Sequence, residues 1–508
     1  MPAQQPANAS PATATAGAAG DTWNLRLWLG ISLYLLLNAG SQALVSGTAD
    51  QDQAEQLLLS QHWALGYGAQ PPLYTYLVKL LFLFSGPALW TLLGLKVVLL
   101  SLLVGAMLLI GRQLRFRGDQ QLLTLAGMAL IPQFIWESQR DLTHSVLATT
   151  LAAGTLLQLL RLRQRPAPSR FIGLGALLAL GLLSKYSFAV FAASLLLAAL
   201  SLPAFRRALL RPALALTAAT ALVLLAPHLG WVLQHGELAL AGLAKTERAA
   251  GPAWSGVLSA LKAAIAFLTP FWLAALALLW PQRHQLQRAN PAGAADQALL
   301  QRLPLALLAV LLVFVLSTGA TRIKDRWYQS LLFYAPLSVA TLAPPGAGRR
   351  LRWLVGSGLA AAATAALLLP GRTALAGLTG KSSRPNYPLP QLVASLVQQH
   401  GPPDLVLASN GLVGGNTRLA LPAVPVITPQ AGASLPGQAH RPLQVLLLLD
   451  RDDDPADLAA LLPPGQHLPP LQAINLPERW APQRPYGIRY AWLAWPGLPS
   501  GAGPNLAP

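Results

Sequence analysis

The sequence predicts a mainly α-helical, polytopic membrane protein, in which a bundle of about eleven spans is followed by a small α/β domain. Three observations predict this fold class. Only 11% of the 508 residues are charged and 54% are hydrophobic, whereas a soluble domain carries about 25% charged residues. Many apolar residues stand in runs long enough to cross a bilayer. Residues 371–508 differ, because short apolar runs alternate there with Gly, Pro and Asp.

Composition also excludes several functional classes. The chain has no cysteine, which excludes a disulfide scaffold, a thiolate nucleophile and a Cys-ligated metal. A formal net charge of +18 would suggest a nucleic-acid partner if the chain were soluble. The positive charge lies between apolar runs instead of on one face, so we expect membrane lipids and no nucleic acid among the partners.

The N-terminal residues 1–22 are small and polar, without Lys or Arg. A signal peptide needs a basic region before its apolar core, so we expect a disordered tail here. Residues 23–370 are predicted to form the transmembrane domain. Its expected spans are 23–45, 87–110, 120–136, 143–160, 171–183, 188–203, 213–233, 256–280, 304–320, 330–343 and 353–370. The apolar segment 73–84 is short and follows Pro-Pro, which predicts a surface or re-entrant helix.

The loops between these spans differ in charge. Sixteen Lys/Arg and two acids lie in the loops 111–119, 161–170, 204–212, 281–303 and 344–352. Seven Lys/Arg and eight acids lie in the alternate loops 46–72, 137–142, 184–187, 234–255 and 321–329. A Lys/Arg excess marks the cytoplasmic side. We therefore expect a cytoplasmic N-terminus, a hairpin around Lys185, and residues 371–508 outside.

The C-terminal residues 371–508 are predicted to form a small external α/β domain, periplasmic in a bacterial cell. The apolar runs 405–408 and 445–449 are bounded by Gly, Pro and Asp, which is typical of buried strands. Residues 391–399 have the pattern of a short amphipathic helix.

The first outer loop, residues 46–72, is the most unusual segment. It carries Asp50, Asp52 and Glu55 without any basic residue, and it is longer than a simple connection requires. A solvated acidic loop that obeys the charge bias is one interpretation. The other is a carboxylate that acts as a general base at the outer face.

The residues around this loop resemble a known family. The segment DQAEQLLLSQHWALGYGAQPPLYTYLVKLLFLFSG is similar to the first outer loop of GT-C glycosyltransferases that use polyprenyl-phosphate sugars. The branch it resembles, glycosyltransferase family 39, includes protein O-mannosyltransferases and lipid A aminoarabinose transferases. The resemblance covers about residues 25–345 and implies a GT-C-like bundle and inversion by direct displacement. Its ordered elements are Asp52-Gln53, Gly66-Tyr67, Pro71-Pro72-Leu73 and Phe84-Ser85-Gly86.

Two further segments extend the resemblance. RDLTHSVLATTLAAGTLLQLLR is similar to the second outer loop of the family, where an acid opens the fourth span, and Asp141 takes that place. GLLSKYS resembles a family hairpin with Lys185 at its tip. Gln53 stands where the family has a second acid, which disfavours a role that needs two adjacent carboxylates. No histidine pair has a ligand spacing, so no metal ligand is predicted and a divalent metal is left open.

Sugar transfer from a polyprenyl phosphate requires two kinds of group. A base takes the proton of the acceptor hydroxyl, and cations stabilise the phosphate leaving group. Asp52, or failing it Asp50, suits the first role, with Asp141 supporting the site geometry. Cations of the outer loops suit the second, although Lys and Arg near span ends also bind lipid head groups. The candidates are Lys185 and Arg326, which are preferred, and Arg322, Lys324, Lys245 and Arg248.

Three further residues are candidates for substrate binding. Lys96 lies within the apolar stretch 87–110, and an intramembrane ionisable residue is a functional candidate by default. The alternative is a span that begins later, with Lys96 at its edge. Tyr67 and Gln70 lie in the first outer loop, where an aromatic residue also suits an interfacial belt.

These observations predict an integral-membrane glycosyltransferase of the bacterial inner membrane. It would move a sugar from a polyprenyl-phosphate donor to a lipid, glycan or protein acceptor at the outer face. A transporter or flippase for a lipid-linked or anionic substrate is the alternative, and it should place ionisable residues at the midplane of two repeated halves. A membrane scaffold that binds a partner through the external domain is a third class.

Overall fold

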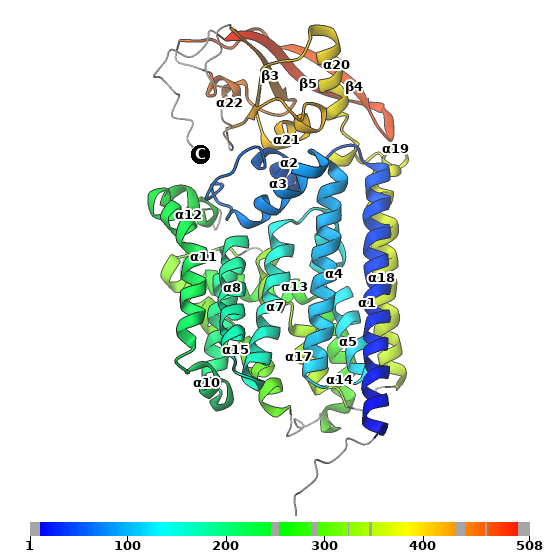
Figure 1. Ribbon diagram of the computed structural model, residues 1–508. Coiled ribbons are helices and arrows are strands. Elements are labelled where there is room, and N and C mark those ends of the chain that lie inside the picture. The colour runs from blue at the N-terminus through cyan, green and yellow to red at the C-terminus, as the bar shows by residue number, and fades with distance from the viewer. Residues whose placement is uncertain are drawn as a thin grey trace, which may run out of the picture.

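The computed structural model describes residues 11–244, 253–285, 293–323, 325–344, 348–429, 431, 442–462 and 465–495. In this part of the chain a long helical bundle carries a small sheet domain at one end (Figure 1). We call that end of the bundle the sheet end. Helix α1 (Pro11–Val45) begins inside the segment 1–22 that was expected to be a tail. Its first residues are rich in Ala, the best helix former.

Six helices of the described ranges are long and apolar enough to cross a membrane. They are residues Thr22–Val45 of α1, α4 (Leu89–Gln113), α7 (His144–Gln164), α11 (Leu214–Gln234), α15 (Ala294–Thr318) and α18 (Gly348–Ala374). Two bent helix pairs raise the number to eight if each pair is one span. These are α9 (Phe188–Leu200) with α10 (Pro203–Leu209), bent by 109°, and residues Trp254–Leu268 of α13 (Ala253–Leu268) with α14 (Phe271–Leu279), bent by 73°.

By length and composition, the described residues therefore contain fewer candidate spans than the eleven expected. All eleven segments are helical, but apart from the six long helices and the two bent pairs, three segments form only helices shorter than 18 residues. Two prolines help to keep these helices short. Pro132 and Pro336 have no backbone N–H, so neither can donate the hydrogen bond that would extend the preceding helix. The short helices are α5 (Gly118–Ala129) followed by η1 (Gln133–Glu137) and α6 (Ser138–Arg140), α8 (Pro168–Ser184), and α16 (Gln329–Leu332) with α17 (Ala335–Leu342).

The first expected outer loop, 46–72, and the short apolar segment 73–84 that follows it each form a short helix at the sheet end (Figure 1). Helix α2 (Gln51–Leu59) is followed by α3 (Leu73–Ser85), an apolar helix too short to span. It ends at Gly86, whose φ of 68° suits glycine. Other connections are α12 (Gly236–Ala244), η2 (Trp280–Gln285) and η3 (Asp325–Tyr328).

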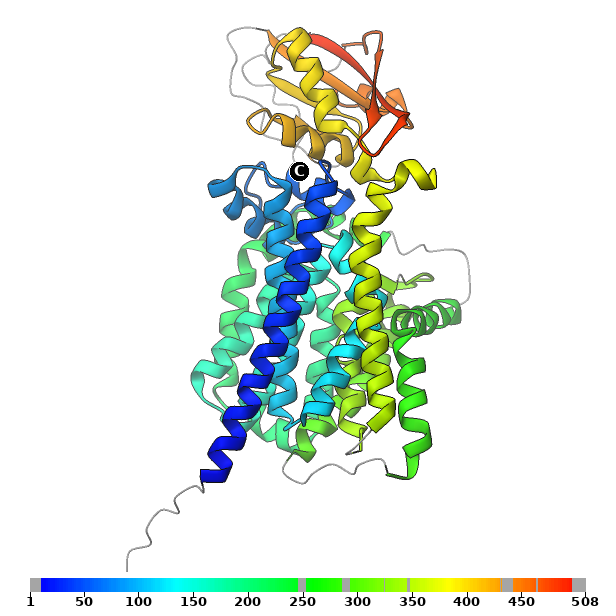
Figure 2. The same cartoon turned by 90° about the vertical axis from the view of Figure 1, so that its right-hand side faces the viewer.

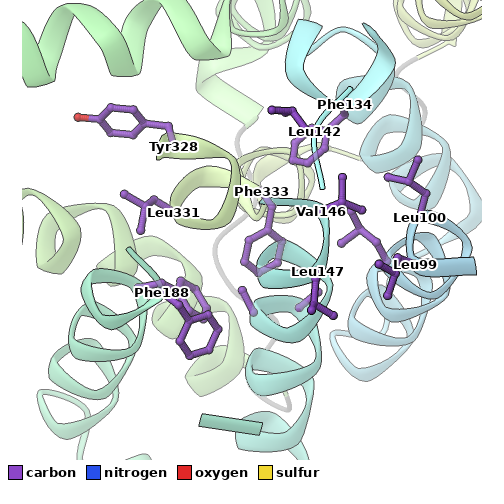
Figure 3. Packing of buried hydrophobic residues seen from close by; sticks show 14 of the residues in the cluster. Leu99, Leu100, Phe134, Leu142, Val146, Leu147, Phe188, Tyr328, Leu331 and Phe333 are labelled. Atoms are coloured by element: carbon purple, nitrogen blue, oxygen red, sulfur yellow. The ribbon is translucent and has the colours of Figure 1, made fainter. Parts of the chain in front are cut away.

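Large apolar side chains fill the centre of the bundle. Figure 3 shows Leu147 of α7, Phe188 of α9 and Phe333, which follows α16, among these buried residues. The Phe191 and Phe333 rings lie 5.6 Å apart. This packing joins α7, α9 and α16. It therefore holds in place the helix ends that carry polar residues at the sheet end.

The C-terminal part forms a five-stranded sheet in the order β2-β1-β3-β5-β4. Strand β1 pairs in parallel with β2 and β3, whereas β5 pairs antiparallel with β3 and β4. The expected strands and helix are present. The strands are β1 (Leu405–Ala408), β2 (Val426–Ile427), β3 (Leu443–Asp450), β4 (Gln472–Glu478) and β5 (Ala481–Trp495). The helices are α19 (Ala376–Thr379), η4 (Arg384–Asn386), α20 (Leu389–His400), α21 (Gly411–Ala420) and α22 (Pro455–Ala459).

The sheet domain is joined to the bundle through α2. The Asn416 side chain of α21 accepts the N–H of Ala49 at 2.7 Å and donates to its carbonyl at 3.1 Å. The backbone of Gly415 approaches Ala54 so closely that an added Cβ would lie 2.1 Å from the Ala54 carbonyl oxygen. A glycine is therefore needed there, and the sheet domain fixes the position of the first loop.

One buried ion pair joins two helices at the end opposite the sheet. Arg163 near the end of α7 donates to both carboxylate oxygens of Asp296 at the start of α15, at 2.6 and 2.7 Å. Asp296 is 1% exposed. This pair holds α7 and α15 together away from the sheet end.

Asp296→Asn is expected to lower the stability of the protein by about 3 kcal/mol, because it leaves a largely buried guanidinium without its charge partner. Asp119→Asn is the matched control, since Asp119 pairs with Arg117 nearer the surface and such pairs contribute less than about 1 kcal/mol. Thermal unfolding in detergent measures both. Equal unfolding midpoints would contradict the role given to the buried pair.

Candidate active site

Asp50 anchors the N-terminus of α2. Its side chain accepts the N–H of Gln51 at 2.9 Å, and the Gln53 side chain accepts the N–H of Asp50 at 3.1 Å. These bonds form a capping box. Gln53, which departs from the family pattern, thus has a structural use. Three guanidiniums also surround the buried Asp50 carboxylate: Arg384 at 3.3 Å, Arg372 at 3.7 Å and Arg140 at 3.9 Å.

Asp141 holds the same helix end from another element. It lies between α6 and α7 and is 6% exposed. One of its carboxylate oxygens accepts the N–H of Asp52 at 3.0 Å. A carboxylate at a helix N-terminus is favoured both by this hydrogen bond and by the helix dipole. Residue 141 is therefore fixed against the first turn of α2, and the two acids singled out in the sequence lie side by side.

The Asp52 carboxylate lacks the close contacts that engage the carboxylates of Asp50 and Asp141. Asp52 is half-buried, and within the described residues its carboxylate oxygens make no hydrogen bond or close ion pair. Burial raises the pKa of Asp52, while the positive charges of Arg326, Lys185 and Lys96 act to lower it. Burial, and then the charges of Asp52 and Asp50, raise the pKa of Asp141 to about 7. Asp52 is the carboxylate of this group that remains available to bind a proton from a ligand.

Two cations face Asp52 from separate elements. Lys185 lies in the turn between α8 and α9, and its Nζ donates to the Ser145 hydroxyl at 2.5 Å. Burial, and then the charge of Arg326, lower the pKa of Lys185 to about 8. Arg326 lies in η3 and is exposed. A carboxylate beside two cations forms a site that can accept a proton while stabilising an anionic leaving group.

Lys96 is a third cation at the carboxylates. It projects from α4, is 3% exposed and interacts electrostatically with Asp141, Asp52 and Asp50. Its Nζ is buried and donates no hydrogen bond within the described residues. A buried ammonium without a hydrogen-bond acceptor is unfavourable unless a charge partner is near, so the acids explain its position inside the bundle.

A polar network that the sequence did not indicate packs beside the carboxylates. Gln56 of α2 meets the His144 ring at 3.0 Å and accepts from Thr75 of α3 at 2.9 Å. The other ring nitrogen of His144 lies 3.2 Å from the Ser184 carbonyl. Tyr74, next to Thr75, contacts the His144 ring, and its buried hydroxyl has no hydrogen-bond partner in the described structure. This network joins α2, α3, α7 and α8 around the site.

The structure places Tyr67 and Gln70 in a tight turn. Their backbone groups pair with each other at 3.0 and 3.1 Å. The Tyr67 hydroxyl donates to the His62 carbonyl and accepts the N–H of Ala64. Both residues shape the loop, and within the described residues neither makes a hydrogen bond with Asp50, Asp52 or Asp141. Burial raises the pKa of Tyr67 to about 12, so its phenol stays neutral.

Four further cations were candidates from the sequence: Arg322, Lys324, Lys245 and Arg248. Arg322 is exposed and lies just before η3. Lys324, Lys245 and Arg248 lie outside the described residues. Among the residues that the structure does describe, no group of three His, Cys, Asp or Glu side chains is arranged to hold a metal ion.

Comparison with known proteins adds the family context. The family model described as dolichyl-phosphate-mannose-protein mannosyltransferase matches residues 69–231. The lipopolysaccharide core galacturonosyltransferase RgtB of Rhizobium johnstonii is 32% identical over 490 residues, covering 92% of this chain and 97% of its own. RgtA of the same organism is 30% identical over 490 residues, covering 91% and 96%.

A solved structure shares the fold. The crystal structure of ArnT from Cupriavidus metallidurans bound to undecaprenyl phosphate has a TM-score of 0.51 and 13% sequence identity, with 92% of this chain and 97% of that chain covered. The similarity covers both the helical bundle and the sheet domain.

Asp50→Ala is expected to be less stable than Asp50→Asn by about 1 kcal/mol, because asparagine still accepts the hydrogen bond of an N-cap and alanine does not. Both variants lose the charge that faces the three arginines, so the pair isolates the cap. Thermal unfolding of the two variants in the same detergent is the measurement. Identical midpoints would show that Asp50 does not cap α2.

Proposed function

Because the chain belongs to the GT-C superfamily of polyprenyl-phosphate-sugar-dependent glycosyltransferases, we propose that it transfers a galacturonosyl group to a lipopolysaccharide core. Membership, in the branch of the protein O-mannosyltransferases and aminoarabinose transferases, makes the chain a multi-pass membrane glycosyltransferase with a lipid-linked sugar donor. The choice of sugar and acceptor rests on the two rhizobial relatives. The choice of undecaprenyl phosphate as the lipid rests on the ligand of the ArnT structure.

One observation carries the assignment of the site. Among the three acids at the start of α2, only Asp52 has a carboxylate that is free of hydrogen bonds and close ion pairs within the described residues. Asp50 is engaged by its cap and by three arginines, and Asp141 accepts the N–H of Asp52. We therefore assign Asp52 as the general base and Asp141 as the residue that positions it.

The proposed reaction is a single displacement. Asp52 takes the proton of an acceptor hydroxyl, and the resulting oxygen nucleophile attacks the anomeric carbon of the sugar. The bond between that carbon and the phosphate oxygen breaks, and the lipid phosphate leaves with the electron pair. Because attack and departure occur on opposite faces, the configuration at the anomeric carbon inverts.

Lys185 and Arg326 are assigned to the departing phosphate. Both interact electrostatically with Asp52, so the two cations and the base face one region. A fixed cation beside developing phosphate charge in a water-poor site contributes several kcal/mol. A uronic acid brings a second negative charge, which a site with Lys96 as a third cation favours.

The sheet end is assigned to the outer face of the membrane. Asp52, Asp141, Lys185 and Arg326 lie in the set of loops that together hold seven Lys/Arg and eight acids, whereas the alternate loops hold sixteen Lys/Arg and two acids. A Lys/Arg excess marks the cytoplasmic side. The sheet domain is then periplasmic, on the side where a lipopolysaccharide core would be reached.

Asp52→Asn is expected to lower the transfer rate at least about 100-fold, because general-base catalysis typically contributes that much or more. The assay follows radiolabelled galacturonate from undecaprenyl phosphate to lipopolysaccharide. Glu237→Gln is the control, since Glu237 is an exposed acid on α12. An Asp52→Asn enzyme that retains most of its activity would contradict the assignment of Asp52 as the general base.

The pH dependence tests Lys185. It stabilises the phosphate only while protonated, and its pKa is lowered to about 8, so the rate is expected to fall as the pH rises above that value. Lys185→Arg lowers the overall rate but keeps its charge, because guanidinium stays protonated up to about pH 12. Its rate profile is therefore expected to lose the alkaline decline. The same decline in both proteins would contradict this role.

A further inference from the structure

A small cavity next to Asp50 is not used by the proposed reaction. Its walls come from the ends of α1, α4 and α18 at the sheet end, and the segment after α18 contributes Pro385. Charged and apolar side chains divide the lining. The charged ones are Asp50, Arg140 and Arg372, and the apolar ones include Val45, Leu89 and Leu369. We call it the arginine cavity.

Positive charge exceeds negative charge around the arginine cavity. Arg140, Arg372 and Arg384 share the single carboxylate of Asp50, and two of the three separations, 3.7 and 3.9 Å, are long for an ion pair. Glu137 binds Arg140 at 2.7 Å and so neutralises one of them. Within ion-pair distance, the described residues thus set three guanidiniums against two carboxylates, those of Asp50 and Glu137.

Arg372 also has an unused donor. Its Nε is buried and has no hydrogen-bond partner in the part of the chain that the structure describes. A buried N–H without an acceptor costs free energy, which a bound acceptor would offset. The surplus charge and this free donor both favour an anion.

The position of the cavity favours a lipid as the source of that anion. Helices α1 and α18 run side by side along the bundle (Figure 2). They expose apolar side chains that include Leu37, Leu44, Leu367 and Leu368, which is the surface that acyl chains cover. Val45 and Arg372 are half-buried, so the cavity is reached from that side.

We propose that the arginine cavity binds the anionic head group of a membrane lipid, and that this lipid is the acceptor. The phosphate or carboxylate of the head group would accept the free Nε–H of Arg372 and lie beside its guanidinium charge. Arg140 directly precedes Asp141, and Asp50 lies two residues before Asp52. An acceptor anchored here would present its sugar to the base. The acceptor role rests on the proposed function, whereas binding of an anionic lipid does not.

Native mass spectrometry of the full chain in detergent tests the binding. Phosphatidylglycerol is expected to be retained and phosphatidylcholine is not. Arg372→Met is expected to reduce the retained phosphatidylglycerol about tenfold, since a charge-assisted hydrogen bond contributes about 1.5 kcal/mol or more. Val45→Trp fills the cavity without removing a charge and should have the same effect, which separates loss of the site from misfolding. Arg384→Lys is the control, because Arg384 contacts Asp50 without lining the cavity and the lysine keeps its charge, and this variant should retain the lipid.

Transfer kinetics test the acceptor role. Arg372→Met and Val45→Trp are expected to raise the KM for lipopolysaccharide about tenfold and to leave the KM for the donor unchanged. Equal retention of both lipids, or displacement of phosphatidylglycerol by millimolar inorganic phosphate, would overturn the lipid site. Loss of lipid with an unchanged acceptor KM would overturn the acceptor role. A wild-type protein that binds the lipid but transfers no galacturonate would overturn the proposed function and leave the lipid site standing.

Discussion

The site depends on how the N-terminus of α2 is held. Asp50 caps the helix from its own chain, and Asp141 accepts the next N–H from the corner between α6 and α7. Both carboxylates are buried, and the arginines and lysines around them offset the cost of that burial. Because these two acids satisfy the helix end, the third, Asp52, keeps its carboxylate free. One arrangement therefore fixes the helix and leaves the half-buried Asp52 carboxylate free for the proposed role of base.

The sheet domain helps to hold the N-terminus of α2 in place. Asn416 binds both backbone groups of Ala49, directly before the cap, and Gly415 lets α21 approach Ala54. Arg384, which contacts Asp50, comes from the segment that leads into the domain. The first loop is thus held between the bundle and the sheet. Without these contacts, a surface loop of this length would lack the packing that fixes its acids in place.

Sequence patterns located much of this site because charge is scarce in the chain. The charge of the outer loops and the family resemblance together pointed to Asp52, Asp141, Lys185 and Arg326. The structure brings Lys185, Arg326 and Asp141 within electrostatic reach of Asp52. The choice between Asp50 and Asp52 was left open, since it depends on the helix cap. Arg372 and Arg384 were not indicated, because they lie more than 300 residues from Asp50 and only folding brings them there. Six to eight candidate spans of the described residues pass a test of length and composition, against eleven expected, because apolar runs do not show where proline shortens a helix.

The central claim is that the donor phosphate lies between Lys185 and Arg326 with the Asp52 carboxylate facing the transferred sugar. A structure of the protein with bound undecaprenyl phosphate tests it most directly. We expect phosphate oxygens within hydrogen-bonding distance of the Lys185 Nζ and the Arg326 guanidinium. We expect no contact between this lipid and Asp50 or its arginines. A phosphate bound in the arginine cavity instead, with Lys185 still held only by Ser145, would contradict it.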